Sequence, residues 1–269
     1  GELRVGDQVH APDGKPVRVL ALSEHYTDSR CFLIRFSDGA RLIAGAGHQW
    51  RVRQKIRRRT ANGRDAEWED VVISTEHLPE RADVGVLQHA VAGIPRQLPI
   101  DPYVLGCWLG DGDSSTGRIC GADDEIFERI VAKGYRVSHS HCPQRAPFQS
   151  RTVYGLGAGL RALGVINAKH IPAQYLEASA YQRMELLRGL MDTDGHCNTR
   201  GTATFCNTNK QLASKTWELA AGLALRPRIR SYNALAGTYW QVSMQSHTDR
   251  IPFWLKRKAK RSIAPSAHR

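Results

Sequence analysis

The chain of 269 residues carries a formal net charge of +12 and is 41% apolar, which is enough material for one large domain or two ordinary ones. It contains no run of 18 apolar residues, which excludes a membrane-spanning helix. Its first residues lack the apolar core of a signal peptide. We therefore expect a cytoplasmic protein without a membrane partner.

Arginine outnumbers lysine by 29 to 9. Excess positive charge favours a polyanionic partner, because binding releases the counterions that phosphates hold. Guanidinium groups also grip phosphates and guanine edges with two donors. The composition therefore favours nucleic acid as the partner, against the plainer alternative of charge that serves solubility.

The six cysteines show neither a C-x-x-C pair nor the spacing of a disulfide framework. Reduced thiols fit an intracellular protein best. His139, His141 and Cys142 have the composition of a zinc site. On a short strand they would alternate between two faces, which disfavours a shared metal ion.

The first residues alternate β-forming runs with turns rich in glycine and aspartate, which predicts strands near 17–22, 31–36, 40–43 and 49–52. The spacing is typical of a mainly β domain of hairpins, which we assign to residues 1–98, with a possible turn of helix near 76–81. Segment 51–67 carries cations almost without apolar cover, so repulsion predicts a loop. Either this loop is merely solvated or its arginines contact DNA; they are Arg51, Arg53, Arg57, Arg58 and Arg59.

From residue 99 to residue 269 the pattern is α+β, and it occurs twice. The first copy predicts a helix over 103–109 and then a strand at 118–120, a helix at 123–133, strands at 135–139 and 152–156, and a helix at 158–163. The second copy predicts a helix over 184–191 and then a strand at 202–206, a helix at 210–223, and strands at 228–232 and 239–244. A duplicated unit predicts an internal pseudo-two-fold arrangement in one domain.

Both apolar helices carry small residues four positions apart. They are Gly106 and Gly110 in the first helix, and Gly189 and Thr193 in the second. Residues at this spacing share one helix face, and glycine inside a helix costs about 1 kcal/mol. Small residues on one face let two helix backbones approach closely. We therefore expect the helices to pack on these faces, with their C-terminal ends together.

An aspartate closes each of these helices, Asp111 in G-D-G and Asp194 in T-D-G. Two carboxylates held close repel each other, and a hard divalent cation relieves the repulsion. Such a site suits phosphate chemistry, because a metal polarises the phosphate and activates water. The plainer alternative is a pair of helix C-caps with turn residues, which is less persuasive for two copies in a basic, duplicated chain.

The segments LGCWLGDG at 105–112 and LLRGLMDTDG at 186–195 resemble the two motifs of single-chain LAGLIDADG homing endonucleases. The segment KHIP at 169–172 resembles the lysine-containing block before the second motif of intein-encoded members. The resemblance covers roughly residues 99–260. It implies a monomeric saddle of two αββαββα halves, which binds double-stranded DNA at a long asymmetric target. It also implies Mg²⁺-dependent cleavage of both strands across the minor groove, with Mn²⁺ or Ca²⁺ able to substitute for binding.

The resemblance also assigns roles to residues. Asp111 and Asp194 match the metal-binding acids, assisted by the carbonyls of Gly110 and Thr193. Lys169 matches the lysine near the attacking water or the phosphate in one half. In the other half the counterpart is Lys258, with Lys256 as its competitor. Exposed strand residues should contact bases or phosphates; the candidates are Arg118, Arg136, His139, Arg151, Arg200, Arg228, Arg230, Tyr232 and Gln241.

The first residues, with LRVGDQV at 3–9 and GAGHQW at 45–50, resemble the Hint splicing domain of inteins. The resemblance gives His48 the position of the histidine that promotes the first acyl shift. Gly45 stands where inteins usually have threonine, residue 1 is glycine, and the sequence ends in Ala-His-Arg. Without a nucleophile and a cyclising asparagine, we expect no splicing by the sequence as given.

Two other functions remain open at this point. The saddle of an endonuclease is also compatible with a DNA-binding regulator or an RNA-splicing helper that has lost cleavage. The presence of both Asp111 and Asp194 argues against that alternative. A protein-splicing module is the second, and the residues at the two ends argue against it.

Overall fold

The computed structural model describes residues 2–11, 13–24, 26–36, 41–60, 63–84, 90–139, 149–234 and 237–263. The chain forms two compact units. Unit 1 comprises Gly1–Val9 and Val17–Gln88, and unit 2 comprises His10–Pro16 and His89–Arg269. None of the helices in the described ranges is long and apolar enough to cross a membrane.

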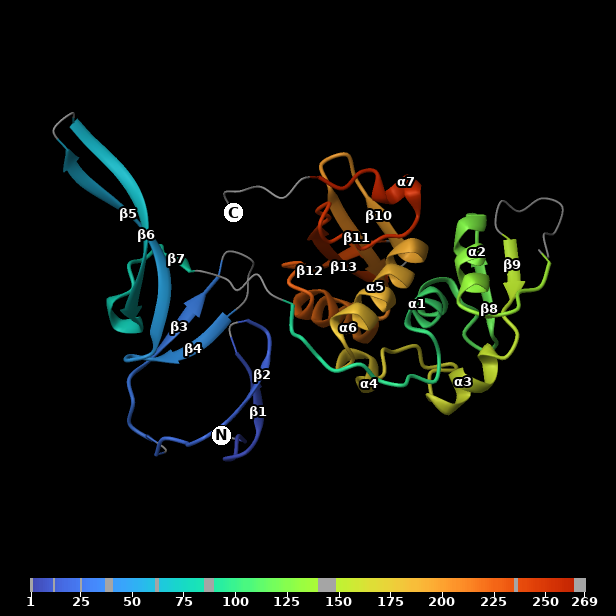
Figure 1. Ribbon diagram of the computed structural model, residues 1–269, viewed down its shortest axis with the longest axis horizontal. Coiled ribbons are helices and arrows are strands. Elements are labelled where there is room, and N and C mark those ends of the chain that lie inside the picture. The colour runs from blue at the N-terminus through green and yellow to red at the C-terminus, as the bar shows by residue number, and fades with distance from the viewer. Residues whose placement is uncertain are drawn as a thin grey trace. The chain divides into compact units, whose positions relative to one another are not determined.

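Unit 1 is built from small sheets of two or three strands, the first of which, β1 with β2, straddles its boundary with unit 2 (Figure 1). Strand β1 (Gln8–His10) pairs with β2 (Pro16–Arg18), and β3 (Cys31–Arg35) pairs with β4 (Arg41–Gly45). A third sheet has the order β6-β5-β7, with bounds Gln49–Thr60 for β5, Gly63–Ser74 for β6 and Asp83–Val84 for β7. A 3-10 helix, η1, spans Thr75–His77 and overlaps the start of the range 76–81, where we expected a helical turn. The small core of this unit is centred on Trp50 and Val52.

The prediction of a loop over residues 51–67 is wrong. Strands β5 and β6 pair continuously from Gln49 opposite Ser74 to Thr60 opposite Gly63. Asp70 accepts hydrogen bonds from the Arg51 guanidinium at 2.7 and 3.2 Å. Opposite charges across a ladder stabilise strand pairing. Repulsion between the cations of 51–67 therefore did not predict the structure, because β6 places acidic residues beside the arginines of β5.

Unit 2 is organised around two central helices, α1 (Pro102–Asp111) and α5 (Ala180–Asp194) (Figure 1). Asp101 caps α1 by accepting from the amides of Tyr103 and Val104, with Pro102 at the first helical position. Ser179 and Gln182 form a capping box at the start of α5. Eight of the ten residues of α1 are buried, so this helix forms the centre of the core.

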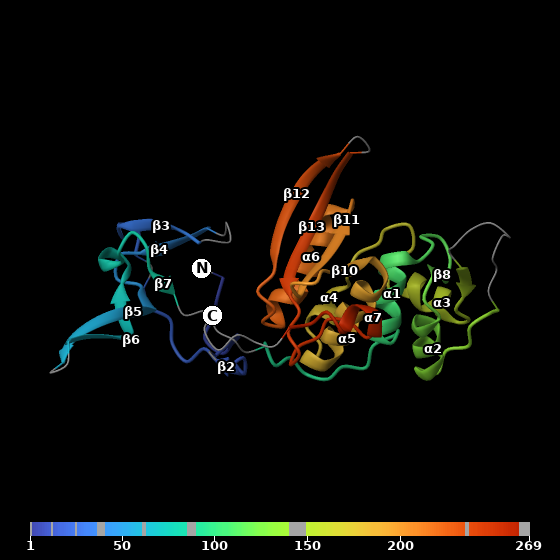
Figure 2. The ribbon, with the colours of Figure 1, turned by 90° about the horizontal axis from the view of Figure 1, so that it is seen from above.

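The two halves of unit 2 flank these helices (Figures 1 and 2). The first half contains β8 (Arg118–Gly121), α2 (Asp124–Ala132), β9 (Gln149–Thr152) and α3 (Leu156–Ala162). The second half contains α4 (Ala173–Leu176), β10 (Gly195–Cys197), β11 (Thr202–Asn207), α6 (Lys210–Gly222), β12 (Arg228–Ala234), β13 (Gly237–Gln245) and α7 (Lys256–Ala259). Its antiparallel sheet has the order β10-β11-β13-β12.

From α5 onward the order of elements is αββαββα, as expected. In the first half, isolated bridges stand at two of the strand positions, between Gly112 and Ile119 and between Val137 and Val153. The strands predicted at 135–139 and 152–156 are therefore wrong in extent. Gly155 lies inside the second predicted range, adopts a φ of +82° and is the N-cap of α3. The chain therefore turns into a helix where the strand was expected to continue. The two halves share an order of elements but differ in how much sheet they form.

Candidate active site

Helices α1 and α5 touch through their backbones. A β-carbon added to Gly106 would overlap the carbonyl oxygen of Leu186 and lie 3.0 Å from the Cα of Gly189. A β-carbon on Gly189 would lie 2.7 Å from the amide nitrogen of Cys107. Such distances are shorter than real Cβ contacts, so only glycine fits at either position. The predicted packing of the helices through their small residues is confirmed.

One turn further on, Gly110 faces Thr193. A β-carbon on Gly110 would overlap the Thr193 hydroxyl and lie 3.0 Å from its Cβ. The hydroxyl is held against its own helix, where it donates to the carbonyl of Gly189 at 2.9 Å. The close approach therefore continues to the C-terminal ends of both helices.

The terminal acids Asp111 and Asp194 meet where these helices end. The pKa of Asp194 is raised from 3.8 to about 6, chiefly by burial and then by the charge of Asp111 and a side-chain hydrogen bond with it. The Asn207 amide donates to Asp194 Oδ2 at 3.2 Å and opposes the rise. The second half thus contributes an acid that shares its site with the acid of the first half.

Lys169 lies against the end of α1. Its Nζ donates to the carbonyl oxygens of Gly110 at 3.1 Å and Gly112 at 2.7 Å, and it lies 5.1 Å from the centre of the Trp108 ring. Burial lowers the pKa of this ammonium, while Asp194 and Asp111 act in the opposite direction. A cation is thereby held beside the two carboxylates.

Lys258 occupies the matching place at the end of α5. Its Nζ donates to the carbonyls of Met191 at 2.9 Å, Asp192 at 2.6 Å and Thr193 at 3.3 Å. Only 5% of the residue is exposed, and burial lowers its pKa to about 8. Lys256, its competitor in the sequence, is exposed and donates its backbone amide to Glu125. Of the two lysines, Lys258 is the one at the helix end.

The donor set at this site fits a hard divalent cation. Two carboxylates share the site, and the pKa of Asp194 is raised partly by Asp111, a repulsion that a bound cation would remove. The carbonyls of Gly110 and Thr193 already accept from lysines, and each has a second lone pair. Across the described ranges, no group of three His, Cys, Asp or Glu side chains forms a metal site, so oxygen ligands beyond the carboxylates would come from backbone, water or phosphate.

Asp192 is a buried acid for which the sequence predicts no role. This buried side chain accepts from the Tyr103 hydroxyl at 2.9 Å and from the backbone amides of Trp254 and Leu255, both at 3.0 Å. Burial raises its pKa to about 6. The corresponding position in the first motif is Leu109. An acid in one motif opposite an apolar residue in the other was the signal that could have identified it.

Several predicted DNA-contacting residues gather on the polar face of the four-stranded sheet. A shallow groove there is lined by Thr202, Arg228, Arg230, Tyr232, Gln241 and Ser243. Figure 2 shows β12 and β13 extending beyond β10 and β11. Tyr232 stacks on Tyr239, with ring centres 5.4 Å apart, and Arg200 is exposed in the turn between β10 and β11.

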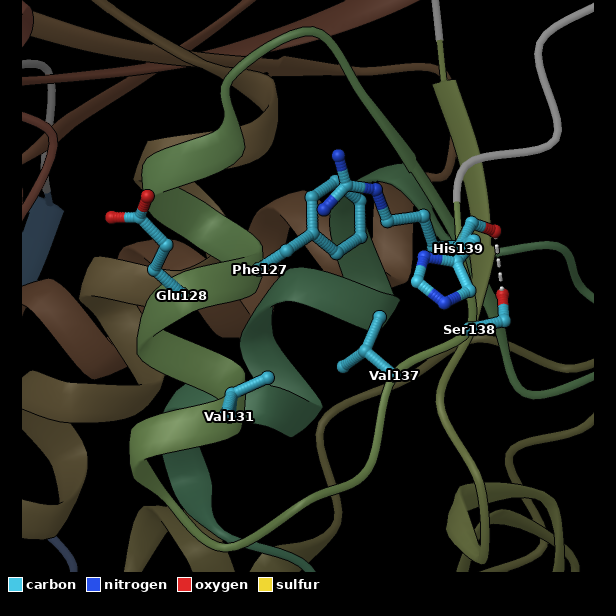
Figure 3. Close-up of a pocket in the computed structure, with 7 residues that line it drawn as sticks. Phe127, Glu128, Val131, Val137, Ser138 and His139 are labelled. Carbon is cyan, nitrogen blue, oxygen red and sulfur yellow. Dashed lines mark hydrogen bonds between the residues drawn. The ribbon is translucent and has the colours of Figure 1, made fainter.

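The first half presents its predicted contacts differently. Arg118 and Arg136 are exposed, and Arg136 lies over the Tyr154 ring at 4.6 Å. Arg151 instead pairs with Asp124 of α2 and covers the Phe127 ring at 4.4 Å. It lines a groove in which His139 and Val137 face Phe127 and Val131 of α2 (Figure 3); the lining residues are Phe127, Glu128, Val131, Val137, Ser138, His139 and Arg151. Arg151 thus holds α2 in place, and its contact with DNA stays a prediction.

The remaining predicted residues are those of the zinc candidate and those of unit 1. His139 is exposed, whereas His141 and Cys142 lie outside the described residues. His48 is exposed, and its ring meets Trp50 edge-on with centres 4.9 Å apart. Arg51 and Arg53 are exposed on β5. The side chains of Arg57, Arg58 and Arg59 lie outside the described part of that strand.

Comparison with known protein families gives no match. The replicative DNA helicase DnaB of Mycobacterium intracellulare is 33% identical over 282 aligned positions, which cover 96% of this chain and 46% of that protein. The namesake from Mycobacterium leprae is 42% identical over 57 positions, covering 21% of this chain and 9% of that protein. The chain thus spans less than half the length of the curated relatives it matches.

Among solved structures, variants of the homing endonuclease I-DmoI have a TM-score of 0.41 and 13% identity, covering 61% of this chain and 92% of theirs. I-DmoI in complex with DNA and Ca has a TM-score of 0.41 and 14% identity, covering 55% of this chain and 83% of its own.

Proposed function

We propose that the chain is a metal-dependent DNA endonuclease of the LAGLIDADG homing type, which cuts both strands of a long asymmetric target. The observation that carries the proposal is the close contact of Gly106 with Gly189. This contact brings the C-terminal carboxylates of two helices from a duplicated unit into one site, with a buried lysine beside each helix end.

The chemistry follows from what these side chains can hold. Asp111 and Asp194 would bind a divalent cation, preferentially Mg²⁺, which when bound polarises a phosphodiester and lowers the pKa of water. Lys169 and Lys258 each place an ammonium at one helix end, where it stabilises the charge that develops on a phosphoryl group. Their carbonyl contacts fix both ammonium groups in advance, so little reorganisation is needed during the reaction.

The polar face of the four-stranded sheet would bind the DNA. A sheet or two-stranded ribbon fits the major groove, and Arg228, Arg230 and Gln241 carry the donors and acceptors that contact bases and phosphates. The net charge of +12 supports binding by counterion release. We assign a supporting, sequence-independent role to Arg51 and Arg53 of β5.

The origin of the chain is part of the proposal. We infer that it derives from an intein inserted in a gene for a replicative helicase, on the basis of its likeness to DnaB of Mycobacterium intracellulare and of the Hint-like segments around His48. The sequence contains no G-x-x-x-x-G-K-[S/T] loop, the phosphate-binding loop of many ATP-driven motors. We therefore do not extend helicase activity to this chain, and we expect it to act on DNA inside the cell.

The test is a cleavage assay on a DNA duplex that carries the host-gene sequence without the insert that encodes this chain. This DNA is called the host-site duplex below. With Mg²⁺ the protein should cut both strands, and Asp111→Asn or Asp194→Asn should reduce both cuts by about 10³-fold or more while DNA binding persists. Asp249→Asn, an exposed acid paired locally with Arg250, serves as the matched control. Tight binding without any Mg²⁺-dependent cut would instead indicate a DNA-binding protein that has lost catalysis.

A further inference from the structure

The segment that carries Lys258 is anchored to α5 by one buried carboxylate. Asp192 is 1% exposed, and its Oδ1 accepts the backbone amides of Trp254 and Leu255, both at 3.0 Å. Its Oδ2 accepts the Tyr103 hydroxyl at 2.9 Å. Both oxygens are thus engaged by donors away from the paired acids, which distinguishes Asp192 from a third metal ligand.

This anchor lies one helical turn from the lysine. Leu255 is the N-cap of α7, and its carbonyl accepts the backbone amide of Lys258 at 3.0 Å. The Lys258 ammonium then returns to the same turn of α5, where the carbonyl of Asp192 accepts it at 2.6 Å. Side chain and backbone of a single residue therefore hold both ends of one short loop.

The neighbouring contacts support the same loop. The Trp254 indole donates to Glu185 at 2.8 Å, and the guanidinium groups of Arg129 and Arg188 lie over its ring at 4.5 and 4.1 Å. Arg257 forms a paired contact with Asp123 at 2.7 and 2.8 Å. These groups orient the segment sideways. Two carboxylates accept its backbone amides: Glu125 accepts that of Lys256 at 3.3 Å, and the buried Asp192 accepts those of Trp254 and Leu255 at 3.0 Å.

The first half reaches its lysine by another route. Leu109 stands at the position that corresponds to Asp192, and its side chain has no hydrogen-bond acceptor. Lys169 is held instead through its carbonyl, which accepts from the Asn209 amide at 2.8 Å. A change at Asp192 should therefore disturb one lysine and spare the other.

We infer that Asp192 is a positioning residue for Lys258, and that it controls the cleavage of one DNA strand without acting on the other. The inference about strands rests on the proposed endonuclease function. A displacement of about 1 Å at a reacting centre costs roughly 10²-fold in rate. Loss of the anchor should therefore produce a nicked product in place of a double-strand break.

The test compares Asp192→Ala, Asp192→Asn and Lys258→Met on the host-site duplex, with each strand labelled separately. Asp192→Ala should slow one strand by about 10²-fold, and Lys258→Met should slow the same strand. Asp192→Asn keeps an acceptor oxygen for both amides and should restore cleavage to within about 10-fold of the wild type. Tyr103→Phe removes one partner of Asp192 but leaves both amides bound, so it should preserve the wild-type strand ratio.

A second readout does not need activity. Acetylation of lysines by acetic anhydride, mapped by mass spectrometry, should leave Lys258 protected in the wild type and in Asp192→Asn, and modify it readily in Asp192→Ala. Unchanged protection of Lys258 in Asp192→Ala would overturn the inference, as would equal slowing of both strands in a variant with an unaltered circular dichroism spectrum. Failure of the wild type to cut any strand would instead count against the proposed function, while the labelling would still decide where Asp192 places Lys258.

Discussion

In unit 2, a lysine ammonium lies at the C-terminal end of each central helix, but the two lysines come from different segments and have different anchors. In the first half, Lys169 reaches the carbonyls that end α1 from a segment ahead of α4, held by Asn209. In the second half, Lys258 reaches the carbonyls that end α5 from a segment after the sheet, held by Asp192. The ammonium groups thus lie at equivalent helix ends, but the residues that anchor them differ. Each lysine can therefore be disturbed separately.

The largest separable effect should come from the lysines themselves. Lys169→Met and Lys258→Met each remove one ammonium from the site, and removal of one charge-stabilising group costs about 10²–10³-fold in rate. Each variant should slow a different strand of the host-site duplex, as strand-resolved gels can measure. If both variants slow the same strand, the correspondence between the two halves is wrong.

The next largest effect is a change in the free energy of unfolding with pH, caused by Asp194. The folded pKa of Asp194 is raised from 3.8 to about 6, so the folded state holds a proton between those values that the unfolded state has lost. Stability should therefore fall as pH rises from about 4 to 6 and stay reduced above that.

Asp194→Asn removes this penalty. In chelator at pH 7.5 the variant should exceed the wild type in free energy of unfolding by about 3 kcal/mol, and the difference should vanish near pH 4. Asp192, whose pKa is also about 6, remains in both proteins and cancels. Urea titrations across this pH range measure the difference. A variant less stable than the wild type at pH 7.5 would contradict a penalty on the ionised Asp194, to which burial contributes most and the charge of Asp111 next.

The smallest effect should arise from the exposed arginines of unit 1. The double variant Arg51→Ala and Arg53→Ala removes two exposed cations from β5. It should weaken DNA binding about 10-fold and reduce the salt dependence by roughly two ionic contacts, without changing the ratio of the two strand cuts. Arg81→Ala, an exposed cation of unit 1 outside the ribbon, is the matched control. Binding that is unaffected by the double variant would remove unit 1 from the DNA interface.

The sequence was sufficient for the centre of the site. Gly106 and Gly189 lie where four-residue spacing predicted a face for close packing, and steric exclusion leaves few alternatives to glycine there. The position of the terminal acids follows from that contact. The spacing of these glycines is visible in the sequence because one requirement, the close approach of two helix backbones, determines it.

Other features depend on contacts between distant segments. Asp192 binds amides at positions 254 and 255, which no local pattern indicates. Strand β5 pairs with β6 along its whole length, and Asp70 of β6 accepts from Arg51 of β5, whereas the sequence suggested only repulsion. Arg151 was grouped with surface arginines, but the register of β9 opposite β8 turns it toward α2.

The most direct test of the account is binding of Mn²⁺ to the paired acids, measured by electron paramagnetic resonance with and without the host-site duplex. The account predicts a bound Mn²⁺ signal in the wild type and in Asp249→Asn, and its loss in both Asp111→Asn and Asp194→Asn, because one cation site draws an acid from each half. Mn²⁺ binding of wild-type strength in either of these two variants would contradict the shared site.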